Sequence, residues 1–283
     1  MNKTGEICMR EPFSVLMSIY IKEKPEYVRS CFQSLLAQTV PATEWVVVED
    51  GPLTEEMYAV LDEYQKAYPG LIRRVPLEKN QGLGLALRAG VPECTYELIA
   101  RMDTDDIAKE NRFERQLEEF DKDPDLSICS SYISEFEEDP GSIVAMRKVP
   151  LTNEEIREYQ RKRDAFNHMA VMYKKQAVLD AGNYQSCPLM EDTLLWVNML
   201  KNGVKGKNIA EPLVYVRIGK DMYERRGGFS YFKKYRAGRK RVLQTGYISY
   251  WDYLFSLIIQ FCVAMIPVGL RGIVFKRLLH GNG

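Results

Sequence analysis

The 283-residue sequence contains only two histidines, His168 and His280, and none of its six cysteines forms a C-x-x-C pair. A metal site built mainly on imidazole is therefore excluded, and no cysteines stand at the spacing of zinc ligands. Any divalent ion must depend mainly on carboxylates. Scattered cysteines of this kind are typical of a reduced, cytosolic chain.

The sequence also lacks an excess of either charge, because 39 basic residues balance 39 acidic ones. This balance gives no general attraction to nucleic acid or to acidic partners. Residues 1–12 lack the basic start and apolar stretch of a secretory signal, so we expect the catalytic body to stay in the cytoplasm. A hydrophobic content of 46% is enough to bury a sizeable core.

Short β-rich segments alternate with helical patterns in the first part of the sequence. They lie at 13–20, 45–49 and 98–102. This order predicts parallel strands joined by crossover helices. Strands are also expected at 126–136 and 143–149, and helices at 54–68, 152–163 and 191–201. We therefore predict an α/β domain with a central mixed sheet over residues 1–228.

From Phe229 onward the character of the sequence changes. Lysines and arginines interleave with aromatic residues, and the apolar run that follows at 250–270 is interrupted by three polar residues and by Pro267. Its part from 254 to 270 is shorter than the roughly 20 residues that a spanning helix needs, and Arg271 follows at once. We predict that 229–283 is a helical region associated with the membrane surface, in plane or re-entrant. The alternative is a dimer contact, or packing against the catalytic domain.

The apolar strand at 98–102 continues directly into three acids, Asp103, Asp105 and Asp106. Carboxylates at the C-terminal end of a strand point into the crevice where open α/β sheets bind ligands. Mg²⁺ and Mn²⁺ prefer one or two carboxylates together with substrate phosphate oxygens. The pattern therefore predicts a Mn²⁺ or Mg²⁺ ion that neutralises a leaving nucleoside diphosphate. The alternative is a solvated acidic turn that caps the next helix.

Four separate pieces of the sequence, in order, resemble glycosyltransferase family 2, whose nucleotide-sugar domain has the GT-A fold. The pieces are Ser18-Ile19-Tyr20 with 34–39 after it, Glu49-Asp50-Gly51, 80–84 followed by 103–106, and Glu191-Asp192 with Trp196. Each piece alone is weak, but the ordered set is specific. The resemblance covers roughly the first 200 residues. It implies an enzyme of bacterial capsule, O-antigen or exopolysaccharide synthesis.

By this resemblance the ends of the first two strands hold the nucleotide. Ser18 and Tyr20 would lie near the base, and Asp50 would accept a hydrogen bond from it, which suits the ring N–H of uracil. UDP is preferred over other nucleotides by resemblance alone. Asn80 and Gly82 belong to a segment whose glycines are expected to let the backbone pass close to the donor.

The acidic motif is interpreted by the same resemblance. Asp103 is expected to contact the ribose or sugar of the donor and to support the metal, and Asp105 is expected to coordinate the metal. His168 could touch the metal or the diphosphate, although a single histidine is more often structural.

Three arginines are candidates for phosphate contacts. Arg88 is expected to face a phosphate, with coverage of the sheet as its alternative. Arg225 and Arg226 precede two glycines, so the pair could clamp a diphosphate as a loop closes. Charge at a membrane surface is the alternative for this pair.

Transfer of a sugar to a hydroxyl needs a group that removes the proton of the acceptor. Glu191 and Asp192 begin an amphipathic helix at the position of the family's catalytic acidic pair, so we expect Asp192 to be the base. The alternative is that both acids only complement the helix N-terminus. A single base without a covalent step implies inversion at the anomeric carbon. Because the Gln-x-x-Arg-Trp signature of processive relatives is absent, we expect one sugar per encounter.

The sequence thus predicts a metal-dependent, inverting and non-processive glycosyltransferase that uses a UDP-sugar. By resemblance, its acceptor is a glycan linked to polyprenyl diphosphate at the cytoplasmic face of the bacterial plasma membrane, where the protein is peripheral or monotopic. One alternative is a nucleotidyltransferase, which would attack phosphorus and need no base like Asp192. The other is a catalytically silent, membrane-bound scaffold, against which the intact acids argue.

Overall fold

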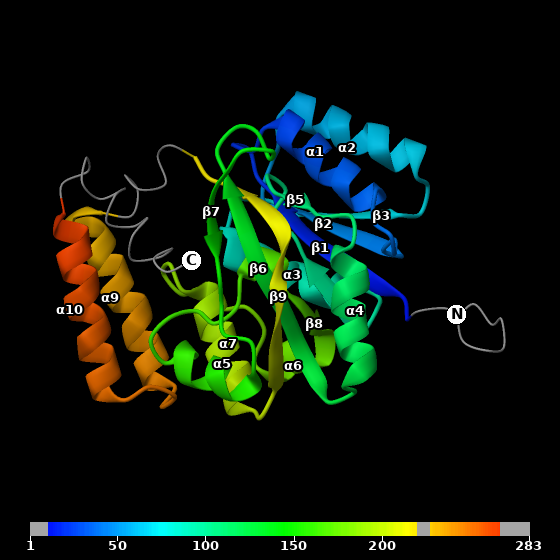
Figure 1. Ribbon diagram of the computed structural model, residues 1–283. Coiled ribbons are helices and arrows are strands. Elements are labelled where there is room, and N and C mark those ends of the chain that lie inside the picture. The colour runs from blue at the N-terminus through cyan, green and yellow to red at the C-terminus, as the bar shows by residue number, and fades with distance from the viewer. Residues whose placement is uncertain (1–10, 220–226, 267–283) are drawn as a thin grey trace.

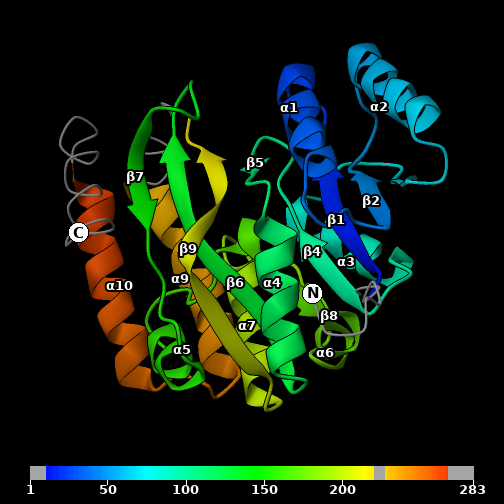
Figure 2. The same cartoon turned by 45° about the vertical axis from the view of Figure 1, so that its right-hand side comes forward.

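The computed structural model describes residues 11–219 and 227–266 (Figure 1). Their strands form one nine-stranded mixed sheet in the order β3-β2-β1-β4-β8-β6-β9-β5, with β7 paired to β6. Helices lie on both faces of this sheet (Figure 2). The predicted α/β class with a mixed central sheet is confirmed.

The first half of the sheet is parallel. It contains β1 (Phe13–Ile19), β2 (Glu44–Glu49), β3 (Ile72–Pro76) and β4 (Leu98–Arg101), which alternate with α1 (Pro25–Leu36), α2 (Glu55–Ala67) and α3 (Leu83–Glu93). β1 is apolar and almost wholly buried, as expected of a parallel strand covered on both faces. The segments predicted at 13–20, 45–49 and 98–102 are β1, β2 and β4. β3 was not predicted, because its sequence IRRVP has no clear apolar alternation.

The second half adds antiparallel pairs. Its elements are β5 (Ile107–Ala108), α4 (Arg112–Lys122), β6 (Leu126–Phe136), β7 (Ile143–Arg147), α5 (Asn153–Gln160), the 3-10 helix η1 (His168–Ala170), β8 (Met172–Lys174), α6 (Lys175–Asp180), α7 (Glu191–Lys201) and β9 (Lys205–Arg217). β8 lies between β4 and β6 and runs antiparallel to both. This three-residue strand therefore joins the two halves of the sheet.

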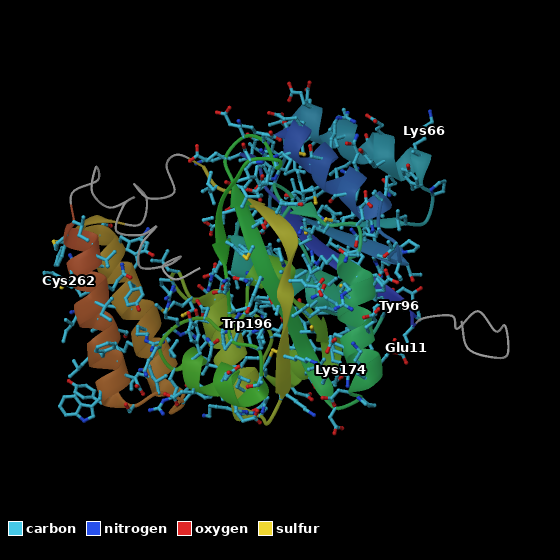
Figure 3. The ribbon with its side chains drawn as sticks, viewed as in Figure 1. Glu11, Lys66, Tyr96, Lys174, Trp196 and Cys262 are labelled. Atoms are coloured by element: carbon cyan, nitrogen blue, oxygen red, sulfur yellow. The ribbon has the colours of Figure 1, made fainter. Side chains whose placement is uncertain are left out.

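Each face of the sheet has its own hydrophobic core. One core packs α1, α2 and α4 against the sheet, and the other packs α3, α5, α6 and α7 against the opposite face. Trp196 of α7, labelled in Figure 3, is fully buried in the second core. α7 is therefore anchored in this core by its one aromatic side chain.

The described part of the predicted basic and apolar region forms a helical hairpin of α9 (Gly228–Gln244) and α10 (Tyr250–Met265), at one side of the molecule (Figure 1). The rest of that region, 267–283, lies outside the described residues. The Phe232 and Phe261 rings pack edge to face at 5.2 Å. Asp252 of α10 pairs with Arg161 at the end of α5, with an N···O distance of 2.9 Å. No helix in the described part of the chain has both the length and the apolar character needed to cross a bilayer. The domain division at 228/229 stays a prediction.

Candidate active site

The carboxyl ends of β1, β2 and β4 meet at one edge of the sheet, because these three strands are parallel neighbours. Tyr20 follows β1, Asp50 follows β2, and Asp103 lies two residues beyond the end of β4. The hydroxyl of Thr104 donates to the Ser18 carbonyl oxygen at 3.5 Å, which ties the acidic turn to the end of β1. The structure thus brings the sequence-predicted nucleotide and acid motifs together.

The buried Asp50 carboxylate holds the loop that precedes α3. One oxygen accepts from the Gln81 backbone N–H at 2.7 Å, and the other accepts from the Gly82 N–H at 3.0 Å. The Asn80 side-chain amide donates to the Asp50 carbonyl oxygen at 3.2 Å. Asp50 therefore shapes this loop, and its predicted contact with a nucleotide base stays a prediction.

The carboxylates of Asp103, Asp105 and Asp106 form a cluster in which one ligand oxygen from each lies within 4.8 Å of the others. Asp106 is buried, and its Oδ2 has no hydrogen-bond partner among the described residues. A buried carboxylate oxygen without a partner is a costly arrangement that a cation would relieve. The residues present therefore fit the predicted divalent ion.

Arg101 supplies the positive charge beside this cluster. Its side chain is 1% exposed, and its two terminal nitrogens bind both oxygens of Asp103, one of them at 2.7 Å. Such a bidentate ion pair fixes the orientation of the carboxylate and balances its charge. The sequence analysis did not identify Arg101, although a lone arginine inside the apolar stretch 98–102 is an unusual signal.

A fourth acid, Glu23, also faces the cluster and was missed from the sequence. Burial, followed by repulsion from Asp105 and Asp103, raises the pKa of Glu23 to about 8. Burial and Asp103 raise the pKa of Asp105 to about 6, and burial raises the pKa of Asp106 well above its usual range. The crowded acids disfavour their own ionisation, so the site is poised to bind positive charge.

Arg217 closes the cluster from β9. Its backbone N–H donates to Asp106 at 2.8 Å, and its Nε donates to the Asp105 carbonyl oxygen at 3.2 Å. The guanidinium stacks between Tyr27 and Phe136, at 4.0 and 4.6 Å from the ring centroids. This residue also escaped the sequence analysis, because a side chain at the end of a distant strand shows no local motif.

Asp192 lies in the first turn of α7, as predicted, with Glu191 beside it. One carboxylate oxygen accepts from the Thr193 N–H at 2.8 Å, and the other lies 3.9 Å from Nδ1 of His168. Burial, then repulsion from Asp164 and Glu191, raises the pKa of Asp192 to about 7. A carboxylate with such a pKa is suited to accept a proton near neutral pH.

His168 contacts the proposed base and the core beneath it. Its Nε2 lies 2.9 Å from the Tyr184 hydroxyl, and its ring packs edge to face on Trp196 at 5.7 Å. Burial, and then Arg101, hold the pKa of His168 well below its usual range, so the ring is neutral. Its predicted contact with the metal or diphosphate stays a prediction.

Arg88 donates from Nη1 to the carbonyl oxygens of Gly182 and Tyr184, at 3.2 and 2.8 Å. These contacts hold the loop before α7, and the predicted phosphate contact of Arg88 stays a prediction. Tyr20 is 36% exposed at the end of β1. Arg225 and Arg226 lie outside the described residues.

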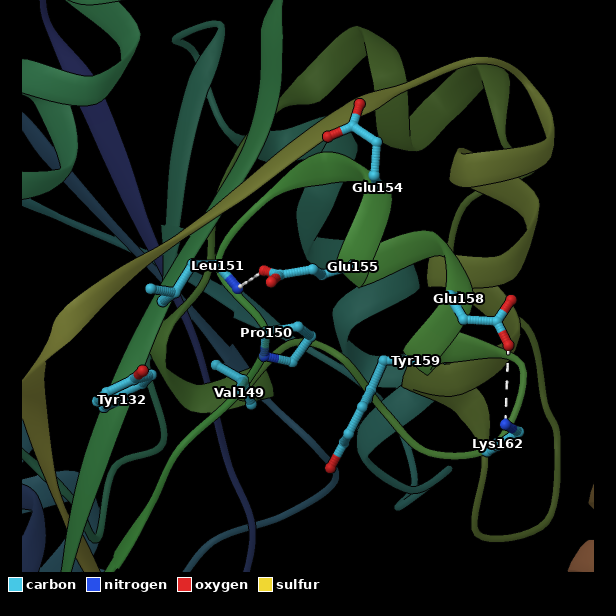
Figure 4. Close-up of a pocket in the computed structure, with 9 residues that line it drawn as sticks. All are labelled: Tyr132, Val149, Pro150, Leu151, Glu154, Glu155, Glu158, Tyr159 and Lys162. Atoms are coloured by element: carbon cyan, nitrogen blue, oxygen red, sulfur yellow. Dashed lines mark hydrogen bonds and ion pairs between the residues drawn. The ribbon is translucent and has the colours of Figure 1, made fainter. Parts of the chain in front are cut away.

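A surface hollow of about 770 Å³ lies away from these residues, between β6 and α5 (Figure 4). Its walls carry Tyr132 and Tyr159 together with Glu154, Glu155 and Glu158. None of the site residues predicted from the sequence lines it. The acids rather than this hollow therefore define the candidate site.

The chain matches a family model described as glycosyl transferase family 2 over residues 14–181. It is 38% identical over 268 residues to the UDP-Gal:alpha-D-GlcNAc-diphosphoundecaprenol beta-1,3-galactosyltransferase of Escherichia coli, covering 95% of this chain and 96% of that protein. It is also 38% identical over 269 residues to the amylovoran biosynthesis glycosyltransferase AmsE of Erwinia amylovora, covering 94% and 98%.

Solved structures share the fold at low sequence identity. The mannosyltransferase PcManGT from Pyrobaculum calidifontis, in complex with GDP-Man and Mn²⁺, has a TM-score of 0.64 at 13% identity, covering 90% of this chain and 70% of that one. S. aureus TarS 1-349 in complex with UDP-GlcNAc has a TM-score of 0.60 at 15% identity, covering 95% and 71%. These likenesses show a glycosyltransferase fold of the GT-A type.

Replacement of Asp50 should reveal its role in holding the loop. In Asp50→Asn, an amide nitrogen replaces one acceptor oxygen opposite a backbone N–H, so we expect the free energy of unfolding to fall by about 1–3 kcal/mol. Urea unfolding of the ligand-free protein measures this change. Asp62→Asn is the control, since the Asp62 side chain is 69% exposed and pairs only at the surface with Arg74. Equal, small losses in both variants would contradict the prediction.

Proposed function

The chain belongs to glycosyltransferase family 2, of the bacterial capsule and O-antigen type, and on that premise we propose that it moves one sugar from a nucleoside diphosphate donor to a lipid-linked acceptor, with inversion. One observation carries the proposal. The acid cluster at the strand ends can hold a cation, the Asp192 carboxylate has a raised pKa, and the charge of Arg101 acts on both. The two groups match the two tasks of glycosyl transfer, which are leaving-group stabilisation and proton removal.

The donor is proposed to be a UDP-sugar held between the ends of β1 and β2. Ser18, Tyr20, Asn80 and Gly82 would line the nucleotide, with Asp50 fixing the loop beside it. The E. coli relative, named for UDP-Gal and for a GlcNAc-diphosphoundecaprenol acceptor, supports this donor class. It equally supports a polyprenyl-diphosphate acceptor. The enzyme would meet this acceptor at the cytoplasmic face of the plasma membrane.

Asp105 and Asp103 are proposed to hold Mn²⁺ or Mg²⁺, with Asp106 behind them. When bound, the ion would offset the charge that the diphosphate gains on leaving. Arg101 keeps Asp103 aimed at that position through its forked contact. The buried, unpartnered oxygen of Asp106 supports a cation at this place.

Asp192 is proposed to be the base. The acceptor hydroxyl oxygen bonds to the anomeric carbon while the bond from that carbon to the diphosphate oxygen breaks. The electron pair of that bond leaves with the diphosphate, and the hydroxyl proton passes to the Asp192 carboxylate. Neutral His168 at 3.9 Å, held by Tyr184, would keep that carboxylate in place. Family membership favours this reaction over the nucleotidyl transfer considered from the sequence.

Transfer to a short-chain GlcNAc-diphospho-lipid tests the reaction directly, with a panel of nucleotide-sugars and Mn²⁺ or Mg²⁺. We expect Asp105→Ala and Asp192→Asn each to lower kcat by about 100-fold or more, since one loses charge at the leaving group and the other loses the base. EDTA should abolish transfer and Mn²⁺ should restore it. Asp125→Asn, in the exposed turn before β6, is the control. Full activity of Asp192→Asn would reject the base, and no transfer from any donor would favour a silent scaffold.

The pH profile gives a separate test of the base. Only the ionised carboxylate accepts a proton, and the pKa of Asp192 is raised to about 7. We therefore expect kcat/KM to fall about tenfold for each pH unit below roughly 7, and to level off above it. Thermal melting at each pH separates this loss from unfolding. A flat profile between about pH 5.5 and 8 would be inconsistent with Asp192 as the base.

A further inference from the structure

The C-terminal hairpin exposes an unusual amount of apolar surface. α10 carries seven of the fifteen large apolar side chains that the described residues expose. Trp251, Phe255 and Ile258 are 77%, 55% and 63% exposed, and Cys262 and Met265 continue the same line. Their spacing of four and three residues puts all five on one side of the helix. We call this surface the α10 ridge.

The α10 ridge is free of charge. Asp252 is the one charged residue between Tyr250 and Met265, and it turns away from the ridge to Arg161 and Ser249. Ser256, on the opposite side of the helix, is buried against Arg239 of α9 at 3.0 Å. Asp252 and Ser256 therefore face the protein, whereas the α10 ridge faces outward.

The neighbouring helix supplies positive charge. α9 contains no acidic residue, and Lys233, Lys234, Arg236 and Lys240 are exposed on it. Lys233, Arg236 and Lys240 are spaced to share one face of the helix. The whole chain has no net charge, so this basic band is a local feature.

We propose that the α10 ridge and the basic band of α9 form a docking surface for an anionic lipid bilayer. Apolar side chains enter the interface while the lysines and arginine contact the anionic headgroups. A second copy of the chain fits less well, because pairing two ridges would bring two basic bands close together. The inference rests on the proposed function, since a membrane-linked acceptor needs an enzyme at that surface.

Vesicle co-sedimentation tests the surface without any sugar transfer, so its failure leaves the proposed reaction untouched. Vesicles of phosphatidylglycerol and phosphatidylethanolamine should bind the protein about tenfold more tightly than vesicles of phosphatidylcholine. Trp251→Glu and Ile258→Glu should each weaken binding to the anionic vesicles about tenfold or more. Tyr68→Glu, at an exposed aromatic residue after α2, is the control and should bind like the wild type.

Either of two results would overturn the docking proposal. One is wild-type binding in both ridge variants, or no vesicle binding by any form of the protein. The other is a dimer in sedimentation velocity that Ile258→Glu dissociates, which would show that a second copy covers the ridge.

The opposite side of α9 contacts the loop that leads into the proposed base. A Cβ atom added at Gly238 would lie 2.4 Å from the Pro188 carbonyl oxygen and 3.2 Å from Met190. Cys187 Sγ lies 3.8 Å from the Gly238 carbonyl oxygen, and Arg241 donates to the Ser186 carbonyl oxygen. Only glycine permits this approach of the helix to the loop.

The loop itself is held in an unusual conformation. Leu189, two residues before Glu191, has a φ of +61°, a region that residues with side chains rarely adopt. Such a conformation persists only where surrounding contacts enforce it. Met190 separates Leu189 from Glu191 and Asp192, so the contacts of α9 with this loop affect the position of the base.

From these contacts we infer that Gly238 is a positioning residue for Asp192. Gly238→Ala should push Pro188 and the first turn of α7 out of place, and should lower kcat about tenfold or more. The affinity for UDP should stay within about twofold, because the donor contacts lie on other elements. The substitution should not lower the melting temperature by destabilising α9 itself, since alanine has a higher helix propensity than glycine. Ala237→Gly, at the exposed neighbouring position, is the control for helix stability and should leave kcat unchanged.

A double-variant cycle separates positioning from general structure. If Gly238 acts through the base, Gly238→Ala should cost less than about twofold further in the Asp192→Asn background. Additive losses in the double variant, or wild-type kcat in Gly238→Ala, would overturn the inference. Full activity of Asp192→Asn in the same assays would instead reject the proposed reaction, so the two failures are distinguishable.

Discussion

The site depends on one buried cation, the guanidinium of Arg101. Four carboxylates, from Glu23, Asp103, Asp105 and Asp106, gather at the end of β4. Burial, and then repulsion from neighbouring acids, raises the pKa of Glu23, Asp105 and Asp106. Arg101 is the fully buried group that pairs with them directly, through both oxygens of Asp103. Burying an arginine without such a partner would cost free energy, so Arg101 and Asp103 hold each other in place.

The influence of Arg101 extends to the other half of the site. Its charge opposes the burial that raises the pKa of Asp192, and it joins burial in keeping His168 neutral. Arg112 stands behind it and donates to the Arg101 carbonyl oxygen at 2.6 Å. Burial lowers the pKa of Arg112 to about 9. Backbone carbonyl oxygens that accept hydrogen bonds from Arg112 therefore stabilise this second buried cation. The same hydrogen bonds fix the end of β4.

The sequence predicted those parts of the site that lie at the ends of its own elements. The strand before Asp103 and the helix after Glu191 have clear local patterns, and the structure has both. Glu23 and Arg217 could not be found in this way, because only the folded sheet brings them to the acids, from the turn before α1 and from β9. Arg88 was interpreted from its place in a motif, while its contacts depend on a loop 94 residues away in sequence.

The architecture assigns the two proposed groups of contacts to different elements. The proposed donor contacts follow β1, β2 and β4, whereas the proposed base belongs to α7, which packs with α5, α6 and α9. The short strand β8 connects the two sets, and the charge of Arg101 acts on both. Because rate falls steeply when reacting groups are displaced by even an ångström, this junction must be rigid. A hairpin that contacts both a bilayer and the loop before Asp192 would then orient a lipid-linked hydroxyl from the side of the base, and leave the nucleotide edge of the sheet open to the donor.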